Sequence, residues 1–185
     1  MALDALAGLG FEAKGAVLNR VMADGYVQVL EIVPSKYIYQ WWAGVQMGVY
    51  SSQVATTLNW PTAPDPVDLA DCQVRGEIRR RNASDRWPLD RVDDELRDQT
   101  AKQGVRFYRL TESPAKTVEA WMTGEVERFA VNPFALIVLA DMAGKRALAE
   151  QLARDEWKGS RDHPSEEAVD RLIRRLGIEP RPGTD

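Results

Sequence analysis

The side chains that could carry out nucleophilic chemistry are few in this chain. His163 and Cys72 are the single histidine and the single cysteine among 185 residues. A Ser-His-Asp or Cys-His mechanism needs a base beside the attacking group, and only His163 could supply it. We expect His163 in a loop between helices and Cys72 on the apolar face of a strand, as a small hydrophobic residue. The sequence therefore predicts no catalytic residues and no cofactor, and it holds too few His and Cys for a zinc site.

Carboxylates remain as candidates for acid-base or cation chemistry. Asp65, Asp68 and Asp71 recur at every third position of a Pro-rich stretch, and oxygen ligands so spaced could gather a hard cation. The spacing is not that of a calcium loop, and the glycine of such a loop is missing. A solvated acidic loop is the alternative, so we predict no metal site and leave cation binding by these aspartates open. No GxGxxG, GxxxxGK[ST] or GxSxG motif occurs.

Basic and aromatic residues are the candidates for binding a partner. Arg75 and the run 79–81 form the one basic cluster, but Glu77 interrupts it, which favours a solvated strand end over a phosphate site. Aromatic side chains gather between residues 37 and 60, where a turn and a Pro-rich loop are hard to bury at once. The alternative is that the loop folds back over the sheet and covers them. The predicted partner-binding residues are Tyr37, Tyr39, Trp42, Trp60, Arg75 and Arg79.

The charge balance limits the class of partner. Lys and Arg total 24 against 28 Asp and Glu, a net charge of -4, so long-range attraction to nucleic acid or anionic lipid is absent. No window has the 18 or so apolar residues of a membrane span, and the first residues do not resemble a secretory signal. A lone cysteine gives no disulfide framework. We expect a cytoplasmic protein with no membrane partner.

Strands are predicted in the first half of the chain. Residues 16–21 and 26–33 flank an Asp-Gly step, which is typical of a β-hairpin, and Pro34 is expected to end the second strand. A third strand, 41–50, should turn Val45, Met47 and Val49 towards the core. Residues 51–71 read as a long irregular segment. Alternation over 72–81 predicts a fourth strand with Cys72, Val74, Gly76 and Ile78 on one face and a solvated opposite face.

Helices are predicted in the second half, after a short lead-in helix over 2–9. Apolar spacing indicates a helix from 89 to about 103, while 105–110 could be a short strand or a turn. Ser113-Pro114 and Asn132-Pro133 are helix starts, and the break at Gly144 predicts an αα-hairpin. Ser165 and Gly177 should bound a last helix.

Strands followed by helices indicate an α+β fold rather than alternating βαβ units. We predict an N-terminal antiparallel sheet of about four strands, a hairpin plus two, with about four to five C-terminal helices packed on one face. Residues 1–179 should form a single domain, and 180–185 a frayed tail.

Several short motifs resemble a bacterial family known as domain of unknown function 4304. They are Gly10-Phe11, Lys14-Gly15, the run 27–35 ending in Pro34-Ser35, 48–50, 72–76 and 87–89, which together span about half of the chain. The resemblance brings no catalytic residues, because the family has no established activity. Small acidic bacterial proteins of this kind include immunity proteins that neutralise toxins, and the resemblance permits that role by analogy of fold.

Three hypotheses follow for function. The first is a non-enzymatic binding protein for a protein partner, held at the sheet edge or the aromatic region, with toxin neutralisation as its most concrete form. The second is an enzyme or small-ligand binder that uses carboxylates and Arg75 in a cleft between sheet and helices. The third is nucleic-acid binding through Arg75 and the run 79–81. The oligomeric state is open.

Overall fold

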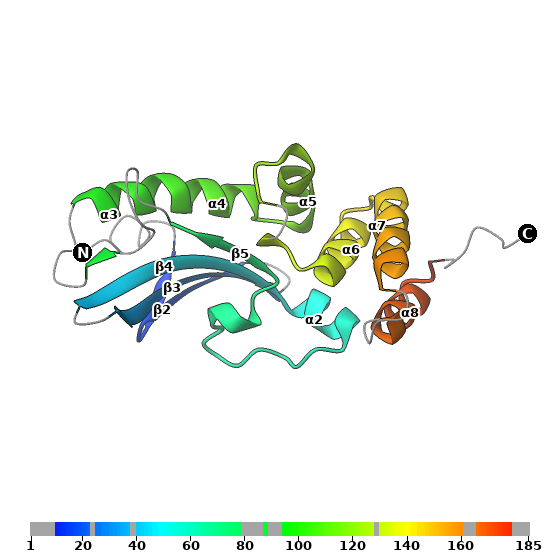
Figure 1. Ribbon diagram of the computed structural model, residues 1–185, viewed down its shortest axis with the longest axis horizontal. Coiled ribbons are helices and arrows are strands. Elements are labelled where there is room, and N and C mark those ends of the chain that lie inside the picture. The colour runs from blue at the N-terminus through cyan, green and yellow to red at the C-terminus, as the bar shows by residue number, and fades with distance from the viewer. Residues whose placement is uncertain are drawn as a thin grey trace, which may run out of the picture. The chain divides into compact units, whose positions relative to one another are not determined.

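The computed structural model describes residues 10–22, 25–37, 40–78, 87–88, 94–127, 130–160 and 166–178. The strands are β1 (Glu12–Lys14), β2 (Val17–Val21), β3 (Tyr26–Tyr37), β4 (Gln40–Ser51), β5 (Val74–Glu77) and β6 (Trp87–Pro88). The helical segments are α2 (Ser52–Leu58), the 3-10 turn η2 (Leu69–Asp71), α3 (Asp94–Gln99), the π-helical turn η3 (Thr100–Gly104), α4 (Val105–Leu110), α5 (Pro114–Thr123), α6 (Pro133–Met142), α7 (Arg146–Gly159) and α8 (Glu166–Arg175). Apart from α2 and η2, which lie between β4 and β5, the strands precede the helices (Figure 1), which confirms the α+β prediction.

The chain divides into two compact units. Unit 1 comprises Met1–Ser52 and Ala63–Glu112, and unit 2 comprises Gln53–Thr62 and Ser113–Asp185. That they fold as the single domain of residues 1–179 stays a prediction. The lead-in helix at 2–9, the run 79–81, His163, Ser165 and the tail at 180–185 lie outside the described residues.

Unit 1 is built on an antiparallel sheet in the order β1-β2-β3-β4-β5, with β6 also pairing with β4. The predicted hairpin is β2–β3, and Gly25 at its turn has φ of 70°. This positive φ suits glycine, which has no Cβ to clash. The prediction that Pro34 ends the strand is wrong, because β3 continues to Tyr37. Proline is tolerated in a strand at a sheet edge, where its missing N–H takes no bond from the ladder.

One face of the sheet, the helix face, packs against α3, η3 and α4 (Figure 1). Gln28 on this face is fully buried and donates to the carbonyl of Tyr108, while the Tyr108 hydroxyl donates to the carbonyl of Val29. Phe107 packs over Gly76. The suggestion of a strand or turn at 105–110 is wrong, since a helical path runs from Asp94 to Leu110. The core side chains predicted from alternation are buried here: Val45, Met47, Val49, Val74 and Ile78.

The opposite face, the loop face, is covered by the segment 63–73, so it is not solvated throughout as expected. Gly48 lies on this face, and a Cβ placed there would be 2.5 Å from Cys72 Sγ and 2.9 Å from Leu69 Cδ1. Cys72 therefore lies against the face of Gly48 and Arg75, not the face of Val74 as alternation predicted. Alternation failed because β5 begins only at Val74. The segment 51–71 is also not wholly irregular, since it contains α2 and η2.

Unit 2 contains α5 to α8 with most of α2. The predicted caps of α5 and α6 are confirmed, because Ser113 Oγ accepts from the Lys116 N–H and Asn132 Oδ1 accepts from the Phe134 N–H. The helices α6 and α7 form the expected αα-hairpin around Gly144 (φ 70°). Helix α6 is buried all round from Ala135 to Ala140, as expected of a central helix.

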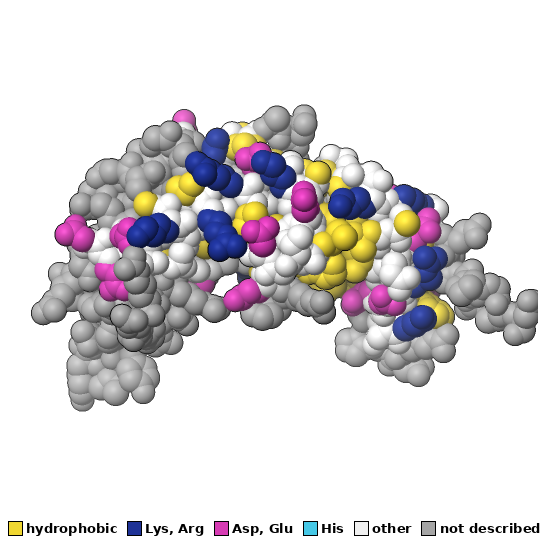
Figure 2. All heavy atoms as spheres, turned by 90° about the horizontal axis from the view of Figure 1, so that it is seen from above, with side chains coloured by type: hydrophobic (Ala, Val, Ile, Leu, Met, Phe, Trp, Pro, Cys, Tyr) yellow, Lys and Arg dark blue, Asp and Glu magenta, His cyan; other side chains and the backbone are white. Residues whose placement is uncertain are grey.

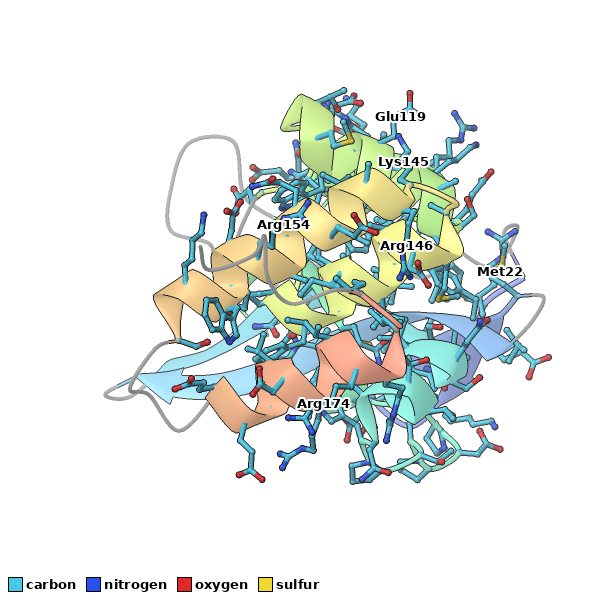
Figure 3. The ribbon with its side chains drawn as sticks, turned by 90° about the vertical axis from the view of Figure 1, so that its right-hand side faces the viewer. Met22, Glu119, Lys145, Arg146, Arg154 and Arg174 are labelled. Carbon is cyan, nitrogen blue, oxygen red and sulfur yellow. The ribbon has the colours of Figure 1, made fainter. Side chains whose placement is uncertain are left out.

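Side chains from α7 and α8 tie the helices of unit 2 together. Arg146 on α7 (Figure 3) donates to Asp141 at the end of α6, to Glu150 one turn on, and to the carbonyl of Gly177 after α8. Arg175 donates to the carbonyls of Thr56 and Thr57 at the end of α2. None of the helices in the described ranges is long and apolar enough to cross a membrane.

Candidate functional site

A pocket of about 370 Å³ opens on the loop face of unit 1. On its sheet side the pocket is lined by residues of neighbouring strands, with Glu12 and Lys14 on β1, Asn19 on β2 and Val27 on β3. These side chains converge because they occupy the same face in the registers Glu12↔Asn19, Lys14↔Val17 and Val21↔Val27. The segment 63–67 forms the opposing wall. The site therefore depends on how this segment is held over the sheet.

Asn19 holds the wall in place. Its Nδ2 donates to the Val67 carbonyl at 2.8 Å, and its Oδ1 accepts from the Val67 N–H at 2.9 Å. Both residues are buried. The backbone N–H and carbonyl of Val67, which do not belong to a strand, are thus both satisfied by the side-chain amide of Asn19. A second anchor is the hydroxyl of Tyr50, which accepts from the N–H of Ala63 at 3.1 Å. These contacts give the pocket a preformed wall.

The pocket rim is charged. Lys14 Nζ on β1 and Asp65 Oδ1 on the wall form an ion pair at 2.5 Å, with side chains 42% and 82% exposed. Such an exposed pair is worth at most about 1 kcal/mol, so it is readily exchanged for other partners. Glu12 lies beside it and has no ion-pair partner within the described part of the chain. The rim thus offers carboxylates to an incoming cationic group.

The three regularly spaced aspartates have separate structural partners. Asp65 pairs with Lys14. Asp68 is the N-cap of η2, where it accepts from the Ala70 N–H at 2.7 Å, and Asp71 Oδ2 accepts from the Asp68 N–H to complete a capping box. Over the described ranges, no group of three or more His, Cys, Asp or Glu side chains is arranged to hold a metal ion.

Cys72 is placed as a packing residue. The side chain is 6% exposed and fills the space over Gly48. Burial raises the pKa of the thiol well above its ordinary value of 9.0, with the positive charge of Arg75 opposing the shift. The neutral thiol is a poor nucleophile, so this environment suits an inert residue.

Two of the predicted partner-binding residues are described with their side chains. Arg75 is exposed, but its guanidinium donates to the carbonyls of Cys72 and Ala70, at 3.2 and 2.7 Å, and so fixes the chain entering β5. Trp60 follows α2 in unit 2 and is 36% exposed. The two residues belong to different units, so the structure does not bring them into one site.

The other predicted partner-binding residues lie at the β3–β4 hairpin or beyond it. Tyr37 is the last residue of β3, paired with Gln40, and Trp42 of β4 is paired with both Ser35 and Pro88. Tyr39 and Arg79 lie outside the described residues. Tyr37 and Trp42 are therefore brought to one end of the sheet, while their part in binding stays a prediction.

Apart from Asp65, which was considered as a possible cation ligand, the residues that build the pocket were not predicted as site residues. Of these residues, Asn19 could best have been found from the sequence. It is an amide within the largely apolar run 16–21, and a buried amide needs hydrogen-bond partners. Lys14 and Glu12 carry no such signal. Their role depends on the segment 63–67, whose position the sequence does not indicate.

The loop face as a whole is acidic. Its described carboxylates are Glu12, Glu31, Glu77, Asp65, Asp68 and Asp71, and its described cations are Lys14 and Arg75. The outer side of α3 and α4 differs, because Lys and Arg side chains there alternate with Asp and Glu (Figure 2). Its exposed cations include Lys102, Arg106 and Arg109. Charge is therefore distributed unevenly over unit 1.

The geometry can hold a cationic group above an apolar floor. Carboxylates at the rim supply the attraction, and Val27 and Val67 supply buried apolar surface. Comparison with known proteins finds no matching family model, no similar curated protein and no similar solved structure.

Proposed function

We infer that this chain is a non-enzymatic binding protein whose partner is a protein with a basic surface, held over the loop-face pocket. Neutralisation of a protein toxin is the most concrete form of this role. The observation that carries the inference is the excess of carboxylates around a preformed pocket. Complementary charge speeds the encounter of two proteins and selects among partners.

The apolar floor supports a protein partner over a free ion. A lysine or arginine side chain has an apolar stem below its charged head, and that shape suits valines beneath a charged rim. A pocket of about 370 Å³ has room for such a side chain. The exposed Lys14–Asp65 pair could open, so that Asp65 and Glu12 face the incoming cation.

The other hypotheses receive less support. An enzyme or small-ligand site using Arg75 is disfavoured because the guanidinium is engaged by two backbone carbonyls. Nucleic-acid binding through Arg75 is disfavoured because its neighbours on the loop face are carboxylates, which repel phosphate. A cytoplasmic location stays part of the proposal.

Affinity capture with the full chain tests the proposal. Wild type would be immobilised beside the double variant Glu12→Lys/Asp65→Lys and the matched control Asp155→Lys, which changes an exposed aspartate on α7. Native host extract would be applied at low and high salt, and bound proteins identified by mass spectrometry. We expect a basic protein to bind wild type and Asp155→Lys, and to be lost from the rim variant and at high salt.

The recovered protein would then be titrated against each purified variant. Reversing two rim charges should weaken binding at least about tenfold, mainly through slower association. Capture of no protein by wild type would refute the proposal. Equal capture by wild type and the rim variant would refute the pocket as its site.

A further inference from the structure

The rim of the loop-face pocket has more acceptors than its one cation uses. Lys14 Nζ contacts Oδ1 of Asp65 at 2.5 Å, and the second oxygen of that carboxylate accepts no hydrogen bond from the described residues. Glu12 also lines the pocket, is exposed, and takes part in no ion pair within the described ranges. Two carboxylates therefore share one ammonium group in the pocket lining. A single added cation would balance the charge.

The two carboxylates approach the pocket from different segments. Glu12 and Lys14 are two residues apart on β1, so their side chains leave the same face of the strand. Asp65 lies on the wall segment, and its contact with Lys14 shows that the wall is within reach of a side chain on β1. A planar group with donors along more than one edge could therefore bond both carboxylates at once.

This arrangement favours a guanidinium group over an ammonium group. A guanidinium carries its N–H donors in a fixed planar fork and stays protonated, whereas an ammonium is a compact point charge. The fork could bond the free oxygen of Asp65 along one edge and Glu12 along another. An ammonium at Asp65 would only repeat the contact that Lys14 already makes.

The apolar part of the lining suits the stem of an arginine side chain. Val21 lines the pocket and is 76% exposed, and its register partner Val27 is buried beside it. An apolar stem could cover both valines while the charged head stays at the rim. The amide of Asn19 is already bonded to Val67, so it does not attract the charged head deeper into the pocket.

We propose that the loop-face pocket is selective for an arginine side chain of the partner protein, whose guanidinium bridges Asp65 and Glu12. This inference rests on the proposed function, because it names the group that the basic partner places in the pocket. It goes further in one respect. Net charge alone attracts lysine and arginine alike, whereas a bridge between two carboxylates distinguishes them.

Three capped amino acids separate the contribution of charge from that of shape. Nα-acetyl-arginine amide has both the charge and the planar fork, Nα-acetyl-lysine amide has the charge alone, and Nα-acetyl-citrulline amide has the planar shape without the charge. Each would be titrated into the isotope-labelled full chain at about 0.15 M salt, with the backbone amide of Val67 as the NMR reporter of the pocket. We expect the arginine probe to bind at least about threefold more tightly than the lysine probe, and the citrulline probe to bind most weakly.

Removal of one carboxylate tests the bridge. Glu12→Gln and Asp65→Asn should each weaken binding of the arginine probe and bring the two basic probes to equal affinity, because a single carboxylate cannot be bridged. The matched controls are Glu119→Gln, an exposed glutamate on α5 (Figure 3), and Asp155→Asn on α7, and both should keep the preference for arginine. A pocket that only attracts positive charge would instead lose affinity for both basic probes by the same factor.

The outcomes separate this inference from the proposed function. The arginine bridge is overturned if wild type does not bind the arginine probe, if it binds the two basic probes equally, or if the preference persists in folded Glu12→Gln and Asp65→Asn. The comparison on wild type decides even where a variant fails to fold. A basic protein that is captured by wild type and lost from the rim variant would uphold the proposed function in each of these cases.

The reverse result is also distinguishable. A wild-type chain that prefers the arginine probe but captures no protein would support the selectivity of the pocket and refute the proposed function. Free L-arginine supplies the last comparison, because it carries the same guanidinium without a peptide chain. Tighter binding of free L-arginine than of the capped probe would assign the pocket to the free amino acid and overturn the assignment to a protein side chain.

Discussion

Replacing Asn19 by alanine is the sharpest test of how the pocket is built. The substitution deletes both hydrogen bonds that hold Val67, and no other side chain is seen to bond these two backbone groups in the described structure. Asn19 and Val67 are 7% and 8% exposed, so water does not readily replace the lost amide. The folded protein must either keep two unsatisfied backbone groups or release the segment 63–67.

The size of the effect follows from these two choices. A buried backbone group left without a partner costs about 1–3 kcal/mol, so two such groups set an upper limit of about 6 kcal/mol if the segment stays in place. Release of the segment satisfies them with water, but it exposes Val67 and loosens the covering of the sheet. That alternative costs roughly the burial energy of a valine, about 1.5–3 kcal/mol. Because the variant adopts the alternative of lower free energy, we expect its unfolding free energy to fall by about 2–3 kcal/mol.

Urea unfolding of wild type and Asn19→Ala, followed by tryptophan fluorescence, measures the loss in unfolding free energy. Gln151→Ala is the matched control, because it deletes an exposed amide that donates to the neighbouring Asp155 on the same helix; it should change stability by less than about 0.5 kcal/mol. Amide exchange at Val67 should become fast in Asn19→Ala. A change no larger than the control, or a Val67 amide that stays protected, would refute the account of the wall.

Two further predictions concern the covering of the loop face. Gly48→Val should destabilise the protein by about 1–3 kcal/mol in the same urea assay, because its Cβ would overlap Cys72, whereas Gly159→Ala has open space and should not destabilise. The Cys72 thiol should react with iodoacetamide only as fast as the protein opens, because burial raises its pKa and keeps it neutral. For the same reason the contribution of Cys72 to the unfolding free energy should hold steady below the ordinary thiol pKa and fall as pH rises above it, since only the unfolded chain then loses the thiol proton. A native thiol that reacts at the rate of a free one would contradict this account.

Most of the fold could be predicted from local signals. The hairpin around Gly25, the caps at Ser113 and Asn132, and the break at Gly144 are all properties of a few adjacent residues. Local chemistry is sufficient for these because a cap or a turn is satisfied within its own segment. The α+β order followed from them directly.

The errors share a different cause, which is contact between distant segments. A proline would interrupt a strand in the middle of a sheet. Here Pro34 lies where β3 pairs with β4 on one side, so β3 continues to Tyr37. Cys72 fits the alternation of β5, yet it packs against Gly48, a residue of a different strand. A periodic pattern cannot show where a strand lies in its sheet or what covers it, so both errors follow from the same limit.

The same limit bears on function. Asp65, Asp68 and Asp71 could be considered together as cation ligands because only their spacing was known, but the structure gives each a different partner. Asp68 and Asp71 satisfy the backbone of η2, and Asp65 reaches Lys14 on β1. Their charge nevertheless remains on the loop face, since neither a cap nor an exposed ion pair removes it. A carboxylate that does not bind a cation can therefore still contribute to the negative electrostatic potential of the loop face. For this reason the proposed function depends on the charged rim of the pocket and not on the spacing of the three aspartates.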